Sequence, residues 1–117
     1  MSTLSTFPIQ PGTAKVLKIS ERGELLAVMG GFTTVTGLAF DARGRMYVEE
    51  FSAAPGFPTP GAGKIVRVDG SGPIEDFLTG LVVPTGLLYG PDGALYVSDF
   101  GAAPPGLGRI LRVTIPD

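Results

Sequence analysis

The chain has 117 residues, a formal net charge of −2 and neither cysteine nor histidine, whereas glycine and proline number 18 and 11. A chain of this length forms no more than one domain, and its charge offers no attraction for nucleic acid. The missing residue types exclude disulfides and thiolate metal sites and remove the commonest general base, and no apolar run approaches the roughly 18 residues of a membrane span.

Short strands separated by glycine- and proline-containing turns are predicted along the whole chain. Residues 1–13 are rich in Ser, Thr and Pro and are predicted to be an N-terminal tail; they lack the basic start and apolar core of a signal peptide, and the cellular compartment stays open. The predicted strands and hairpins then follow in order at 15–19, 24–29, 35–51, 64–68, 73–79, 85–97 and 109–113. Gly44 lies where a hairpin turn favours positive φ, and the frequent glycines and prolines disfavour helix.

An internal repeat organises these strands. Residues 36–48 recur as 85–97, and the offset of 49 holds without a gap from Lys15 and Lys64 to Pro55 and Pro104. After a shorter loop, residues 109–113 repeat 64–68 at an offset of 45. Four antiparallel strands in a unit of about 45 to 50 residues are typical of a β-propeller blade. We therefore predict an all-β fold in which residues 14–117 form a two-bladed unit.

Each predicted blade is a four-stranded antiparallel sheet. The repeats cover about 15–63 and 64–108, and residues 109–115 add an extra copy of the third strand. Consecutive apolar residues at 38–40 and 87–89 predict inner strands that are buried on both faces. The second blade lacks its outermost strand, and residues 24–29 of a neighbouring subunit can supply it.

Two blades do not close a ring, so each open end would expose an apolar sheet face. Covering such faces is worth on the order of 10 kcal/mol gross per junction at about 25 cal/mol per Å². The sequence therefore predicts head-to-tail assembly of copies into a closed ring. A homotrimer with six blades is the favoured arrangement, and a tetramer with eight blades is the alternative.

The segment at residues 84–101, with the sequence PTGLLYGPDGALYVSDFG, resembles the NHL-type repeat. More closely, nearly everything after Lys15 is similar to the ScyD/ScyE family of propeller proteins, which occur in cyanobacterial scytonemin gene clusters and elsewhere. The ending at residues 106–113 is similar to the last blade of such proteins. The resemblance implies a β-propeller that is often exported, and it implies no enzymatic activity and no catalytic residues. Full family members have several blades, so this chain is shorter than the proteins that it resembles.

Polar residues near the predicted central channel are the first candidate site. Asp99 ends a strand, and Glu50 takes the same position in the other repeat, beside Glu49. In NHL-like blades an acid at this position usually accepts hydrogen bonds from nearby loop amides, and the resemblance implies the same role here. The alternative is that Glu49, Glu50 and Asp99 ring the pore and hold a hard cation such as Ca²⁺. Thr36 and Thr85 begin the inner strands, where they are expected to bond the backbone or to line a pore for water or ions.

The second candidate site is a face of long, apolar loops, because such loops often carry recognition. Its members are apolar or proline residues of the loops that join outer to inner and second to third strands: Phe32, Phe57, Pro58, Pro60, Val82, Val83 and Leu107. Their alternative role is to pack on each other. A small molecule or a peptide is the expected ligand of this face, and neither a nucleic acid nor a membrane is an expected partner.

Two functions remain open. The first is a non-catalytic ring that serves as a scaffold or binding module. The second is a metal-dependent hydrolase of the six-bladed gluconolactonase-like type, which sets Glu, Asn and Asp ligands at its axis. The chain contains no asparagine and no histidine, so the sequence favours the scaffold and predicts no enzyme, no confident metal ligand and no cofactor beyond the Ca²⁺ alternative.

Overall fold

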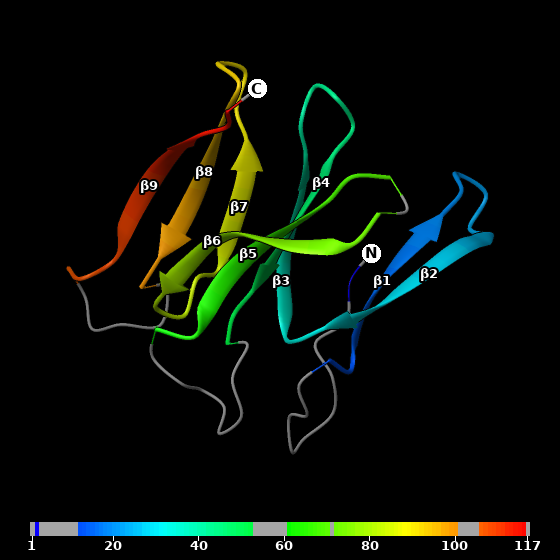
Figure 1. Ribbon diagram of the computed structural model, residues 1–117, viewed down its shortest axis with the longest axis horizontal. Coiled ribbons are helices and arrows are strands. Elements are labelled where there is room, and N and C mark those ends of the chain that lie inside the picture. The colour runs from blue at the N-terminus through cyan, green and yellow to red at the C-terminus, as the bar shows by residue number, and fades with distance from the viewer. Residues whose placement is uncertain (1, 3–11, 53–60, 71, 101–105, 117) are drawn as a thin grey trace.

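A computed structural model describes residue 2 and residues 12–52, 61–70, 72–100 and 106–116. Within these ranges the chain is all-β, with nine strands in three antiparallel sheets and no helix (Figure 1). The predicted strands are confirmed, with these bounds: β1 Ala14–Ile19, β2 Leu25–Phe32, β3 Val35–Phe40, β4 Met46–Glu50, β5 Gly63–Val68, β6 Ile74–Leu81, β7 Gly86–Tyr89, β8 Ala94–Asp99 and β9 Arg109–Thr114. The described part of the chain has no helix that is long and apolar enough to cross a membrane.

Each sheet is open and is built from strands that follow one another in the chain. β1 and β2 form a two-stranded sheet, β3 to β6 a four-stranded sheet, and β7 to β9 a three-stranded sheet. Leu38 pairs with Val48 between β3 and β4, and the residues 49 positions later, Leu87 and Val97, pair between β7 and β8. One chain therefore completes one four-stranded sheet, and its three-stranded sheet lacks the outermost strand, as the sequence predicts; within the chain β2 pairs with β1.

The four-stranded sheet lies between the other two sheets (Figure 1). All five residues of β4 are buried, because its alternate side chains enter two different cores. Met46 and Val48 pack with Val16 and Phe32 of the two-stranded sheet. On the opposite face, Tyr47 joins a second core, whose members outside β4 are Ala39, Ile65, Leu81, Leu95 and Val97.

The inner strands are each exposed on one face in the single chain. Phe40 in β3 is 57% exposed and Leu88 in β7 is 62% exposed. The expectation that both faces are covered applies to a blade with a neighbour on each side, and the open ends of the single chain expose apolar faces, as the sequence predicts. The physical reason is that β1 and β2 cover only part of one face of the central sheet, and no described residue covers the outer face of β7.

The hairpin turn between β3 and β4 is held by one carboxylate. Asp41 Oδ1 accepts hydrogen bonds from the backbone N–H groups of Arg43 and Arg45 at 2.9 and 3.0 Å. Asp41 Oδ2 accepts from Tyr47 Oη at 2.9 Å and from Arg45 Nε at 2.7 Å. Gly44 has φ of 78°, as the sequence predicts for this turn. These contacts fix the hairpin that carries the buried strand β4.

Candidate functional site

Two buried carboxylates end the second strand of their sheets, Glu50 in β4 and Asp99 in β8. Asp99 Oδ1 accepts a hydrogen bond from the Val82 backbone N–H at 2.8 Å, and Asp99 Oδ2 accepts one from Arg109 Nη2 at 2.8 Å. Glu50 Oε2 accepts from the backbone N–H of Thr33, which lies 49 positions before Val82. Each acid, at the end of a second strand, therefore accepts a hydrogen bond from the backbone of the loop that precedes the adjacent inner strand. This is the expected bonding to a loop amide.

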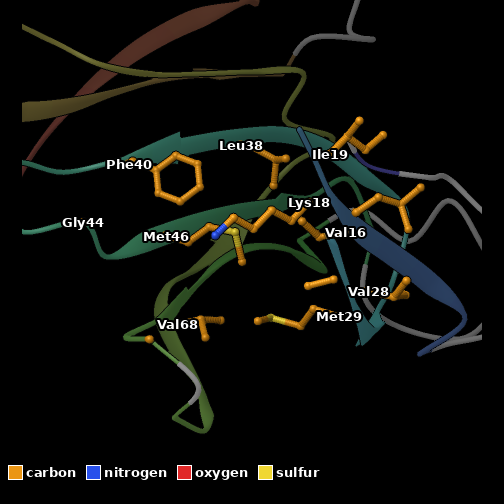
Figure 2. Close-up of a pocket in the computed structure, with 13 residues that line it drawn as sticks. Val16, Lys18, Ile19, Val28, Met29, Leu38, Phe40, Gly44, Met46 and Val68 are labelled. Carbon is orange, nitrogen blue, oxygen red and sulfur yellow. The ribbon is translucent and has the colours of Figure 1, made fainter. Parts of the chain in front are cut away.

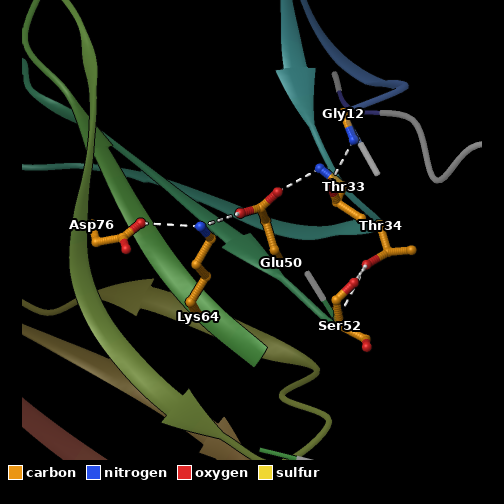
Figure 3. Close-up of polar contacts among 7 residues, drawn as sticks. All are labelled: Gly12, Thr33, Thr34, Glu50, Ser52, Lys64 and Asp76. Carbon is orange, nitrogen blue, oxygen red and sulfur yellow. Dashed lines mark hydrogen bonds and ion pairs between the residues drawn. The ribbon is translucent and has the colours of Figure 1, made fainter. Parts of the chain in front are cut away.

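Each of these acids also faces a cation at the start of the next strand, Arg109 for Asp99 and Lys64 for Glu50. Figure 3 shows the contacts of Glu50. Lys64 Nζ lies 3.9 Å from Glu50 Oε1 and 3.0 Å from Asp76 Oδ1. Burial raises the pKa of Glu50, and the bond from Thr33 and the charge of Lys64 oppose that rise. The sequence analysis missed Lys64 and Arg109, although they occupy the same position of the repeat at an offset of 45.

The loop before each inner strand contains a residue with unusual backbone geometry. Thr34 and Val83 are 49 positions apart and have φ of 43° and 42°. A β-branched residue in this region is strained by about 1 to 3 kcal/mol. At Thr34 the strain is offset by two hydrogen bonds, because Oγ1 donates to the Ser52 carbonyl at 2.9 Å and accepts from the Ser52 N–H at 3.0 Å.

Glu49 lies where β3 approaches β7, and it is fully buried. Its Oε1 atom accepts a hydrogen bond from Thr36 Oγ1 at 2.9 Å, whereas its Oε2 atom is buried without a hydrogen-bond partner. Burial raises the pKa of Glu49 to about 7, opposed by the bond from Thr36 and reinforced by the charge of Asp99. A Cβ atom at Gly37 would lie 3.2 Å from Oε1 and 3.0 Å from Leu87 Cβ, so glycine permits this close approach.

The candidate channel residues are only partly brought together. Thr36 bonds Glu49, and Thr85 is exposed, with its backbone N–H donating to the Ser98 carbonyl at 3.0 Å. Among the described residues, no group of three or more Asp, Glu, His or Cys side chains is arranged to hold a metal ion. Glu49, Glu50 and Asp99 of one chain therefore do not form the cluster of ligands that the Ca²⁺ hypothesis requires.

The candidate loop face is only partly open. Phe32 is fully buried between β1 and the central sheet, where it packs with Ala14 and Val35, so its ring is not available to a ligand. Val82 and Val83 are half-buried, and Leu107 is exposed. Phe57, Pro58 and Pro60 lie outside the described residues.

An apolar cleft of about 450 Å³ lies between the two-stranded sheet and the central sheet (Figure 2). Its floor on the central sheet is formed by Leu38, Phe40 and Met46, and Val16 and Met29 face them from β1 and β2. This volume falls in the range of ligand pockets. The sequence analysis missed the cleft, because it depends on how far β1 and β2 extend over β3.

Comparisons of the chain with protein-family models, with curated proteins and with solved structures found no match.

Proposed function

We propose that this protein is a non-catalytic scaffold of the β-propeller type, whose copies assemble head to tail into a closed ring. The observation that carries the proposal is the contrast between the three sheets. The central sheet is covered on one face and partly covered on the other, whereas the sheets at either side leave large apolar residues exposed, among them Leu25 at 60%, Leu88 at 62% and Ile110 at 68%. Exposed apolar sheet faces of this kind mark interaction surfaces.

Three copies per ring are the proposed stoichiometry, which gives six blades, and four copies are the alternative. Each chain brings the strands of two blades: one complete sheet, and a three-stranded sheet that β2 of a neighbour completes. The resemblance to NHL-type and ScyD/ScyE repeats supports the propeller interpretation. The ring would present the loops near Val82, Val83 and Leu107 to a small molecule or a peptide.

The competing function is a metal-dependent hydrolase of the gluconolactonase-like type. The observation in its favour is Glu49, whose Oε2 atom is buried without a hydrogen-bond partner. Against it, Glu50 and Asp99 already bind backbone amides and cations. Elemental analysis combined with a lactone-hydrolysis assay separates the two functions, since stoichiometric Ca²⁺ or Zn²⁺ with turnover would favour the enzyme.

Light scattering at micromolar concentration tests the scaffold. The expected mass is about three times the 12.1 kDa of one chain. A compact particle of 12.1 kDa that stays monomeric at high concentration would overturn the proposal.

A further inference from the structure

The contact between the central sheet and the three-stranded sheet shows how two neighbouring sheets of this chain fit together. Ala39, Tyr47 and Ile65 on one face of the central sheet are buried in a shared core. The facing side of the three-stranded sheet contributes Leu87, Tyr89 and Leu95 to the same core. The two inner strands approach closely, since a Cβ atom at Gly37 of β3 would lie 3.0 Å from Leu87 Cβ of β7.

The outer face of the three-stranded sheet repeats the buried face of the central sheet. Leu88 and Tyr96 stand 49 positions after Ala39 and Tyr47, and Ile110 stands 45 positions after Ile65. Leu88 and Ile110 are nevertheless 62% and 68% exposed, and no described residue of the chain covers them. One end of the molecule thus displays a face whose counterpart is buried elsewhere in the same chain.

The floor of the cleft corresponds in the repeat to the face of the three-stranded sheet that packs against the central sheet. Leu38, Phe40 and Met46, which form its floor, stand 49 positions before Leu87, Tyr89 and Leu95. The latter three are covered by β3 and β4, whereas Phe40 is 57% exposed. The cleft is open at this point because β1 and β2 repeat only the third and fourth strands, so the sheet they form has no inner strands.

We propose that the cleft binds the three-stranded sheet of a second copy of this chain, with Leu88 of that copy seated against Leu38 and Phe40. This inference rests on the proposed ring and names the surfaces that join in it. The occupant is argued from the chain itself: Leu87 and Tyr89, which correspond to Leu38 and Phe40, are covered by the face of the central sheet that contains Ala39, the residue to which Leu88 corresponds. The cleft also has room for Leu88, which is larger than Ala39 at the equivalent position.

Docking of the whole sheet brings β9 of one copy to the place of β1 in the other, since Ile110 and Val16 both correspond to Ile65. β1 is then displaced from its place beside β2. Within its sheet β1 pairs with β2 alone, whereas β9 arrives already paired with β8 from Ala94 to Asp99. Ile110 then takes the buried place of Val16, and β2 becomes the outermost strand of the joined sheet.

The first test is a pair of matched leucine substitutions followed by light scattering. L88R places an unpaired charge in the proposed contact and is expected to weaken association by about a hundredfold or more. The control L26R changes a leucine that is 56% exposed on β2 and that corresponds to the exposed Glu75. L26R is expected to leave the mass of the assembly unchanged.

The second test exploits the absence of cysteine from the chain. The close pair of Gly37 and Leu87 corresponds, between copies, to Gly86 of one chain and Leu38 of the other. Mixed under oxidising conditions, the L38C and G86C variants are expected to form a disulfide-linked heterodimer in most chains. The control mixture of L26C and G86C is expected to give little of it. This test stands even where L88R does not fold.

The outcomes separate the inference from the proposed function. An assembly that dissociates in L88R and cross-links through Leu38 and Gly86 supports both. An assembly that survives L88R and gives no such cross-link overturns this docking but leaves the ring intact. A monomeric wild type overturns both. Hydrogen exchange tests the strand replacement: assembly is expected to deprotect residues 14–19 and protect residues 109–114, and the reverse would contradict it.

Discussion

The carboxyl group of Glu49 makes the stability of the fold depend on pH. Its pKa is raised from 4.5 to about 7 in the folded chain, chiefly by burial. Between these two values the unfolded chain has released the proton and the folded chain still binds it, so stability is greatest below the lower value and falls as pH rises to the higher one. The loss amounts to about 3 kcal/mol. Glu49 is fully buried, so solvent screening does not reduce this figure much.

The E49Q variant should therefore gain stability over the wild type as the pH rises. We expect little difference near pH 4, where both side chains are neutral, and a gain of about 3 kcal/mol near pH 8. Urea unfolding at both pH values measures the change. E24Q, at an exposed position before β2, is the control and should show no such trend. A stability difference that is the same at both pH values would contradict the assignment.

Thr34 shows how a single hydroxyl group sustains a strained loop. Its backbone has φ of 43°, and its Oγ1 atom makes two buried hydrogen bonds to the backbone of Ser52. T34V keeps the shape of the side chain and removes both bonds, so we expect a loss of about 2 kcal/mol in the free energy of unfolding. T79V, on the exposed surface of β6, should change it by less than about 0.5 kcal/mol. Equal effects of the two substitutions would refute the role of the Thr34 hydroxyl.

At the scale of elements, the two hairpins of the repeat differ in how their tyrosines are placed. Tyr47 is fully buried and donates to Asp41 Oδ2 at 2.9 Å, whereas Tyr96 donates to Asp92 Oδ2 at 2.5 Å in an exposed setting. We expect Y47F to cost about 1.5 kcal/mol, because a buried carboxylate loses a donor, and Y96F to cost less than about 0.5 kcal/mol. Chemical denaturation of the two variants tests this ranking, which the opposite order would disprove.

The strands and turns were predictable from the sequence, because short apolar runs and turn glycines such as Gly44 act locally. The hydrogen bonding of Asp99 to a loop amide was predictable from the resemblance to NHL-type repeats. Exposed apolar faces at the open ends were also predictable from the number of blades, but the particular exposed side chains, Phe40 and Leu88, were not, since they depend on which distant element covers a strand. Three further features depend on contacts that no local pattern encodes. They are the ion pairs of Lys64 and Arg109 with the buried acids, the positive φ of Val83, and the Oε2 atom of Glu49 that is buried without a hydrogen-bond partner.

At the scale of the whole molecule, burial is uneven in a way that a self-contained domain avoids. The central sheet is covered on one face and partly covered on the other, and its two neighbours each leave leucine, isoleucine or valine side chains exposed to water. Exposed apolar area of this extent favours association, which is opposed by lost translational and rotational freedom. Repeat proteins bury such faces by stacking one unit on the next, and a ring does so without leaving an end.

The last prediction concerns how thermal stability depends on protein concentration. If copies bind each other only in the folded state, mass action raises the melting temperature as the concentration rises. Over about a hundredfold range of concentration we expect a rise of several degrees for the wild type, measured by circular dichroism. L88R should melt at one temperature throughout that range, and L26R should follow the wild type. A wild-type melting temperature that does not change with concentration would mean that the exposed faces of Leu88 and Phe40 are not covered by other copies.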